Sequence, residues 1–238
     1  MKNLYPLVSN FIAHRGLHNK NVKSNSLLAI EKAIYKNLPI EIDITLTSDN
    51  IIILCHDSYI KRGKQKILIK NLTYEKLISI DNSIITLNKV LEIVNGKVPL
   101  LIELKPYNKG NILEKECVKL LDNYQGYFAI QSFNPFCIYW FKKHRKDYIR
   151  GQLLTNKYNY NFITNLVYEH MIFNIFTKPD FISYNIKGLP NKTVSRSRKK
   201  LVVLGWTIKT KEELKKYENY CDNFICDNIF EEVLYENK

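Results

Sequence analysis

The sequence predicts an α/β fold, a single-domain (β/α)₈ TIM barrel, and three observations support this prediction. Short apolar segments typical of buried strands alternate with amphipathic segments typical of helices along nearly the whole chain. The chain has 238 residues, a length that suits one such barrel, and its eight Gly and seven Pro are too few for long flexible linkers. Strand-like segments that precede a helix lie near residues 11, 41, 101, 128, 150, 182, 202 and 224.

The first predicted strand, residues 11–13, ends abruptly in His14, Arg15 and Gly16. A buried strand that ends this way delivers two polar side chains to its exposed end, and the glycine lets the backbone turn away. A polar loop follows, in which Ser24, Asn25 or Ser26 can cap the next helix. That helix has an apolar face at helical spacing between residues 27 and 34.

The second strand, residues 40–44, alternates isoleucine with the carboxylates Glu41 and Asp43. Residues two apart on a strand share a face, so the two carboxylates lie side by side. On the inside of a barrel they would repel each other unless a cation lies between them, whereas on an edge strand they would face water. An apolar strand at residues 51–55 follows and ends in His56 and Asp57. We interpret it as an extra strand on the second unit.

The segment from about residue 59 to residue 99 is expected to be a short insertion after the second unit of one domain that covers residues 1–238. Its first part, residues 59–70, is basic and is predicted to be irregular. The strand at residues 100–106 then carries Glu103 and Lys105 near its end. These two side chains share a face and could form a simple ion pair.

The later units repeat the pattern of a strand that ends in polar or aromatic residues. The strand at 127–130 ends in Gln131, and the strand at 201–207 ends near Trp206. The aromatic stretch 158–176 favours a core helix, with a lid or a lipid-facing patch as the alternative. The other expected elements are helices at 112–123, 135–145, 193–200 and 211–219, strands at 149–154, 181–184 and 223–226, and a closing helix to 234.

The formal charge of +13 is compatible with an anionic partner, but lysines scattered along the chain favour a role in solubility. No zinc-finger, basic heptad or ribonucleoprotein motif supports a specific nucleic-acid site. The five cysteines are odd in number and have no Cys-x-x-Cys spacing, which favours reduced thiols. The start of the chain lacks the apolar core of a signal peptide, and no apolar run is long enough to span a bilayer. We therefore expect a cytoplasmic protein.

The active site of such a barrel lies at the carboxyl ends of its strands, where the polar residues above would gather. The carboxylates Glu41, Asp43 and Glu103 are hard oxygen ligands that suit Ca²⁺ or Mg²⁺. Arg15 and Lys105 could bind a phosphate. His14 and His56 could serve as general acid and general base. With Trp206 as an apolar wall, this set predicts cleavage of a phosphodiester.

These motifs resemble those of the glycerophosphodiester phosphodiesterases. The matching residues, in order, are His14-Arg15-Gly16, Glu41-Ile42-Asp43, Thr47-Ser48-Asp49-Asn50, His56-Asp57 with Arg62, Glu103-Leu104-Lys105, Gln131-Ser132-Phe133 and Trp206-Thr207. The resemblance implies a TIM-barrel hydrolase that splits glycerophosphodiesters into sn-glycerol 3-phosphate and an alcohol. It implies a divalent cation on Glu41, Asp43 and Glu103, an acid–base pair formed by His14 and His56, and phosphate binding by Arg15. Lys105, Gln131 and Trp206 complete the expected substrate-binding set.

The chain departs from the family pattern where Glu-Asn-Thr is usual, because it has Ser24-Asn25-Ser26. The lost carboxylate weakens the expected support of the first His and the Arg, so a catalytically weak barrel that acts as a binding module is one alternative. A second is lysophospholipase D activity, which the aromatic stretch and the basic surface favour together with a membrane-surface contact. The related sphingomyelinase D-like phospholipases are a third. The oligomeric state is left open by the sequence.

Overall fold

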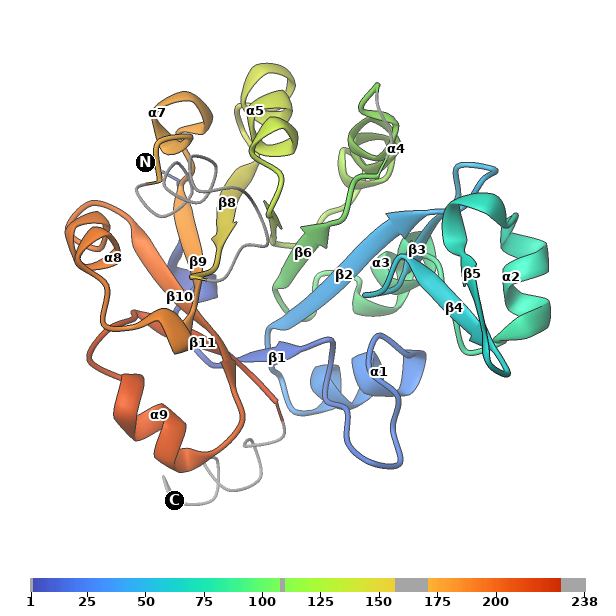
Figure 1. Cartoon of the computed structure of the whole chain (residues 1–238), viewed down its shortest axis with the longest axis horizontal. Helices are drawn as coiled ribbons and strands as arrows, with labels where there is room; N and C mark the ends of the chain where they lie inside the picture. The colour runs from blue at the N-terminus through green and yellow to red at the C-terminus, as the bar shows by residue number, and fades with distance from the viewer. Residues whose placement is uncertain (1, 108–109, 157–170, 228–238) are drawn as a thin grey trace. The chain divides into compact units, whose positions relative to one another are not determined.

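The computed structural model describes residues 2–107, 110–156 and 171–227 (Figure 1). The chain forms two compact units. The terminal unit comprises Met1–His14 and Ala129–Lys238, and the middle unit comprises Arg15–Phe128. No helix in the described part of the chain is long and apolar enough to cross a membrane.

The terminal unit is built on parallel strands that are hydrogen-bonded in the order β1-β11-β10-β9-β8-β7. Apart from β1, the order along the sheet is the reverse of the order along the chain, as expected when each strand pairs with the next through a crossover. The strands are β1 (Ile12–His14), β7 (Phe128–Ser132), β8 (Ile149–Leu154), β9 (Phe181–Asn185), β10 (Val202–Ile208) and β11 (Asn223–Cys226).

Short helices connect these strands, and several of them begin at a residue whose side chain caps the first turn. The side chain of Asn134 accepts a hydrogen bond from the backbone N–H of Phe136 and so begins α5 (Pro135–His144). Thr210 caps α9 (Lys211–Tyr217) in the same way, through the N–H of Glu213. The other helices of this unit within its described residues are η1 (Tyr5–Leu7), α7 (Asn174–Thr177), η3 (Ile186–Gly188) and α8 (Lys192–Ser197).

The middle unit contains β2 (Ile40–Leu46), which is parallel to β6 (Leu100–Leu104) and antiparallel to β3 (Ile52–Leu54). Every residue of β2 and β6 is buried, which explains why isoleucine and leucine dominate them. The helices of this unit are α1 (Leu27–Tyr35), η2 (Ile69–Asn71), α2 (Tyr74–Ile80), α3 (Leu87–Val94) and α4 (Ile112–Leu121).

The prediction that residues 59–70 are irregular was wrong. They form a hairpin of β4 (Tyr59–Arg62) and β5 (Gln65–Leu68), with Gly63 at a φ of +61° in the turn. Ile60 of β4 is buried in a small core with Ile53, Leu77 and other apolar residues of this unit, and Ile67 packs against it. Because lysines lie between these apolar positions, the sequence did not clearly show the alternation that gives the hairpin one buried face.

Two other sequence predictions concern segments that lie wholly or partly outside the described residues. The closing helix to 234 and residues 158–170 of the aromatic stretch lie outside them. Within the described part of that stretch, the prediction of a core helix was wrong, because α7 is a single turn whose Ile175 and Phe176 are exposed.

Candidate active site

Three carboxylates gather on one face of the two parallel strands of the middle unit. Glu41 and Asp43 project from β2, and Glu103 lies directly opposite Asp43 in the register with β6. All three side chains are buried, and one oxygen from each lies within 4.8 Å of the others. The prediction that Glu41 and Asp43 lie side by side on one face of a strand is therefore confirmed, and this face is buried and shared with Glu103.

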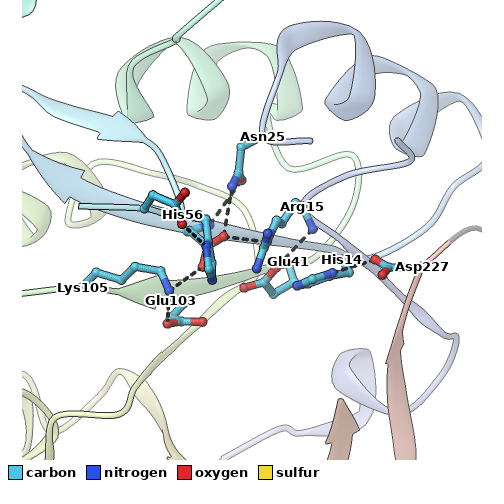
Figure 2. Close-up of polar contacts among 10 residues, drawn as sticks. His14, Arg15, Asn25, Glu41, His56, Glu103, Lys105 and Asp227 are labelled. Carbon is cyan, nitrogen blue, oxygen red and sulfur yellow. Dashed lines mark hydrogen bonds and ion pairs between the residues drawn. The ribbon is translucent and has the colours of Figure 1, made fainter. Parts of the chain in front are cut away.

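Two cations enter this acidic cluster. The Nζ atom of Lys105 lies 2.7 Å from Oε1 of Glu103 and 3.1 Å from Oδ1 of Asp43. The Nε atom of Arg15 lies 2.9 Å from Oδ2 of Asp43, and the backbone N–H of Arg15 donates to Oε2 of Glu41 over 3.1 Å (Figure 2). Arg15 and Lys105 thus reach the carboxylates from two different segments, and the ion pair between Glu103 and Lys105 is one that the sequence suggested.

The pKa values of the three carboxyl groups are shifted in different directions. Burial raises the pKa of Glu41 well above its usual range, and the neighbouring Asp43 and Glu103 raise it further. Burial also raises the pKa of Glu103 to about 7, although Lys105 opposes this shift. Burial alone would raise the pKa of Asp43 as well, but Lys105 and Arg15 together lower it. Crowded carboxylates of this kind favour an additional positive charge between them.

The cluster fits a hard divalent cation in the chemistry of its donors. It offers three carboxylate groups and no sulfur ligand, a set that suits Ca²⁺ or Mg²⁺. Oδ1 of Asp43 is buried and accepts no well-aligned hydrogen bond from any described residue, although Lys105 lies within ion-pair distance. Such an oxygen is available as a ligand.

Asn25 supports Asp43, a role that the sequence did not reveal. Its Nδ2 donates to Oδ2 of Asp43 over 3.0 Å, and its Oδ1 accepts the backbone N–H of Asp43 over 3.3 Å. Asn25 adopts a φ of +56°, which asparagine tolerates better than most residues. Ser26, not Asn25, caps α1 by accepting the N–H of Ala29. The sequence pointed to Asn25 only as one of three consecutive residues that could each cap the next helix.

Gly16 makes the sharp turn that follows Arg15. Its φ is +77°, and a Cβ atom at this position would lie 2.7 Å from the backbone carbon of Ala29. The predicted need for glycine is therefore confirmed, both by the backbone conformation and by the close approach of α1.

His56 is half-exposed and is held by its sequence neighbour. Its Nδ1 lies 2.8 Å from Oδ1 of Asp57, so an ionised Asp57 keeps the proton on Nδ1 and leaves Nε2 as the basic nitrogen. Burial lowers the pKa of His56, and the charge of Lys105 lowers it further, while Asp43 and the hydrogen bond to Asp57 act in the opposite direction. The neutral imidazole is thus favoured near pH 7.

His14 has an equivalent arrangement within the terminal unit. Its Nδ1 lies 2.7 Å from Oδ1 of Asp227, the residue directly after β11 (Figure 2). The parallel register pairs Ala13 with Cys226, so His14 at the end of β1 lies beside Asp227, the residue that follows β11. Asp57 and Asp227 were not among the predicted site residues, although each directly follows a strand end or a histidine.

Gln131 and Trp206 also lie in the terminal unit, with different surroundings. Gln131 is buried on β7, and its Oε1 accepts a hydrogen bond from Oγ of Ser183 over 2.7 Å. The ring of Trp206 meets that of Phe133 edge to face, with 5.7 Å between centroids. Nε1 of Trp206 is buried and has no hydrogen-bond partner among the described residues. It is therefore a donor that a ligand oxygen could satisfy.

A cavity of about 410 Å³ lies in the middle unit beside the acidic cluster. Arg15, Asn25 and His56 line it, together with Ser24 and Lys61 of the hairpin. Two of its other lining residues, Lys23 and Asp81, form an ion pair with each other. No carboxylate pairs with Lys61 in the part of the chain that the structure describes. The cavity is therefore lined both by the phosphate-binding candidate Arg15 and by Lys61, whose charge no described carboxylate neutralises.

Comparison with known proteins agrees with the geometry. The family model described as "Glycerophosphoryl diester phosphodiesterase family" matches residues 14–230. A glycerophosphodiester phosphodiesterase of Caldanaerobacter subterraneus is 30% identical over 147 residues, which cover 53% of this chain and 59% of that protein. The chain spans about half the length of the curated relatives it matches.

Solved structures show the fold. A glycerophosphodiester phosphodiesterase from Thermotoga maritima is similar with a TM-score of 0.75 and 21% identity, over 96% of this chain and 98% of its own. A phosphodiesterase from Oleispira antarctica, solved with the product sn-glycerol-3-phosphate, is similar with a TM-score of 0.81 and 21% identity over 100% of both chains. The predicted (β/α)₈ TIM barrel with a small insertion is thereby confirmed. With most of its length matched by the family model, the chain belongs to the glycerophosphoryl diester phosphodiesterase family.

Proposed function

We propose that this protein hydrolyses glycerophosphodiesters to sn-glycerol 3-phosphate and an alcohol, with the help of a divalent cation. The observation that carries the proposal is the buried cluster of Glu41, Asp43 and Glu103 with Arg15 and Lys105, in a chain of this family. The product sn-glycerol-3-phosphate bound to the Oleispira antarctica neighbour supports the substrate class.

The cluster combines cation binding with phosphate binding. Glu41, Asp43 and Glu103 would hold Ca²⁺ or Mg²⁺, which supplies positive charge to stabilise the phosphoryl oxygens as negative charge develops on them. Arg15 and Lys105 already lie within ion-pair distance of Asp43. In the substrate complex their remaining N–H groups would bind the non-bridging phosphate oxygens.

The two histidines are proposed to move the protons. Each has a carboxylate on Nδ1, which leaves Nε2 to act as base or, once protonated, as acid. His14 is bonded directly to Arg15, so its backbone lies within about 4 Å of the backbone of a phosphate-binding residue. Gln131 and Trp206 are proposed to contact the substrate, Trp206 through Nε1 and the apolar face of its ring.

The chemical step has two candidate nucleophiles. In one, the base removes a proton from water, the water oxygen bonds to phosphorus, and the acid protonates the alcohol oxygen as its P–O bond breaks. In the other, the base removes the proton of the substrate's 2-hydroxyl, whose oxygen bonds to phosphorus while the acid protonates the alcohol oxygen as its P–O bond breaks. Water then bonds to phosphorus in the resulting cyclic phosphate, and the P–O bond to the 2-oxygen breaks as that oxygen is protonated. Both routes balance and give the same final products.

Phosphorus NMR of the products tests the function and distinguishes the two routes. Soluble glycerophosphodiesters with different alcohols, and lysophosphatidylcholine, are incubated with the protein and either Ca²⁺ or Mg²⁺. We expect sn-glycerol 3-phosphate to accumulate, and a transient cyclic phosphate only on the second route. Turnover of lysophosphatidylcholine alone would favour lysophospholipase D activity. No turnover of any substrate with either metal would leave the binding-module alternative.

Matched variants assign the activity to the cluster. Glu41→Ala and His14→Ala are each expected to lower kcat by roughly a thousandfold or more. Glu75→Ala, in the exposed first turn of α2, is the control and should leave kcat unchanged. Glu41→Ala should also lose binding of the metal measured by calorimetry, whereas His14→Ala should keep it.

A further inference from the structure

An exposed apolar patch lies on the outer helices of the terminal unit. Phe136 is 70% exposed and Tyr139 37% exposed on α5, and Ile175 is 69% exposed and Phe176 59% exposed on α7. Ile172, just before α7, is 40% exposed. We call these five residues the α5–α7 patch. Large apolar side chains exposed singly are common, whereas a cluster of this kind marks a surface that binds something.

The residues of the patch form one continuous surface, because contacts between α5 and α7 hold the two helices together. Phe136 and Tyr139 lie one helical turn apart on α5, and Ile172, Ile175 and Phe176 have the spacing of one face of a helical turn. The rings of Phe136 and Phe173 pack edge to face, with 6.3 Å between centroids. The Nζ of Lys142 donates to the backbone carbonyl of Phe176. These two contacts connect α5 to α7, which lie side by side in Figure 1.

Lysines border the patch, and acidic residues are absent from its two segments. The Nζ atoms of Lys142 and Lys143 each lie 5.5 Å from the centre of the Tyr139 ring. Lys178 follows α7 directly. The sequence has no Asp or Glu in residues 133–146 or 171–179, while these segments carry five Lys or Arg. Apolar aromatic residues with lysines at their border are typical of surfaces that lie in the headgroup region of a bilayer.

We propose that the α5–α7 patch binds the surface of a membrane that contains anionic lipids. The side chains of Phe136, Ile175 and Phe176 would enter the boundary between headgroups and acyl chains. Lys143 and Lys178 would remain among the phosphates, each strengthening binding about fivefold. A protein partner is the weaker interpretation, because the exposed side chains of the patch offer one polar atom, the Tyr139 hydroxyl, for specific hydrogen bonds. This docking role is independent of the proposed hydrolase activity.

Sedimentation with lipid vesicles tests this surface with the full chain. Vesicles of phosphatidylcholine alone are compared with vesicles that also contain phosphatidylglycerol, at low and at high salt. We expect binding to the anionic vesicles, weakened by salt. The triple variant Phe136→Ser, Ile175→Ser, Phe176→Ser should lose at least about tenfold in binding. The double variant Tyr5→Ser, Tyr35→Ser is the control, because both tyrosines are strongly exposed and lie outside the patch.

A second pair of variants examines the lysines. Lys143→Gln with Lys178→Gln should weaken binding to anionic vesicles by more than tenfold, and Lys76→Gln with Lys97→Gln, both exposed on the middle unit, should have a much smaller effect. None of these residues belongs to the proposed active site, so hydrolysis of a soluble diester should be unchanged and would report correct folding.

Three results would overturn the proposal. The first is no binding of the wild-type chain to anionic vesicles. The second is vesicle binding that the triple serine variant retains in full, which would place the membrane contact on another basic surface. The third is a dimer of the wild-type chain, measured by analytical ultracentrifugation, that the triple variant loses without any accompanying vesicle binding. In that case the patch is an interface between copies of this chain.

Discussion

Replacing Asn25 by glycine would remove the two hydrogen bonds that hold Asp43 without disturbing the backbone. The amide of Asn25 donates to Oδ2 of Asp43 over 3.0 Å and accepts its N–H over 3.3 Å. A hydrogen bond to a buried charged group contributes about 1.5–3 kcal/mol, and a neutral one about 1 kcal/mol. Glycine adopts the φ of +56° freely, so no backbone strain is added. We therefore expect the free energy of unfolding to fall by about 2.5–4 kcal/mol.

The same change should weaken the metal site, because Asp43 would no longer be oriented. Loss of a residue that orients a ligand typically costs 10–100-fold in metal affinity or activity, so we expect about that loss in both for Asn25→Gly. Asn50→Gly is the matched control, since Asn50 has a φ of +62°, is exposed and lies outside the cluster. It also corrects for the greater freedom of glycine in the unfolded chain.

Urea unfolding and calorimetry with Ca²⁺ and Mg²⁺ measure the two effects separately. The reasoning is refuted if Asn25→Gly folds with the stability of Asn50→Gly and binds the metal as tightly as the wild-type protein. A further variant, Asn25→Asp, keeps an acceptor for the N–H of Asp43 but adds a negative charge beside it. It should be less active than wild type with a structure that remains folded.

Three further predictions concern the same unit. Gly16→Ala should lower the free energy of unfolding by about 2 kcal/mol or more in urea titration, because its φ of +77° and the close backbone leave no room for a Cβ. If His56 is the general base, kcat/KM falls as the pH drops through the pKa of His56, which burial lowers. Asp57→Asn removes a hydrogen bond that raises this pKa, so the acidic limb of the pH profile should move to lower pH. Movement of the alkaline limb instead would make His56 the general acid. Lys61→Gln should raise KM about tenfold for a diester whose alcohol carries a second phosphate, with a much smaller change for an uncharged alcohol, whereas the equally exposed Lys64→Gln should affect neither.

The strands of this protein and the acidic cluster could be predicted because both depend on local pattern. The alternation in residues 40–44 places Glu41 and Asp43 on one face whatever the rest of the chain does. Glu103 joins them because β6 pairs with β2 in parallel, in a register that sets Glu103 opposite Asp43. Parallel strands are buried on both faces, so their sequences are apolar enough to be recognised from one chain.

The partners of these residues could not be predicted because they depend on register and side-chain direction. His14 and Asp227 are separated by 213 positions and meet only because β1 pairs with β11 in one particular register. Asn25 reaches Asp43 through a left-handed backbone conformation that three consecutive capping residues did not specify. The hairpin was missed for a related reason, since its lysines obscured two isoleucines that face one small core.

The three residues Ser24, Asn25 and Ser26 have separate roles in the structure. The sequence suggested that Ser24, in place of the usual carboxylate, would weaken support for the site. In the structure Asn25 supplies both hydrogen bonds to Asp43, Ser26 caps α1, and Ser24 lines the cavity beside Arg15. Ser24 is uncharged, so it adds no negative charge to the cavity wall that Arg15 and Lys61 also line, and the hydrogen bonds to Asp43 do not depend on it. We therefore expect the protein to prefer substrates with additional negative charge, and the Lys61→Gln variant tests this preference.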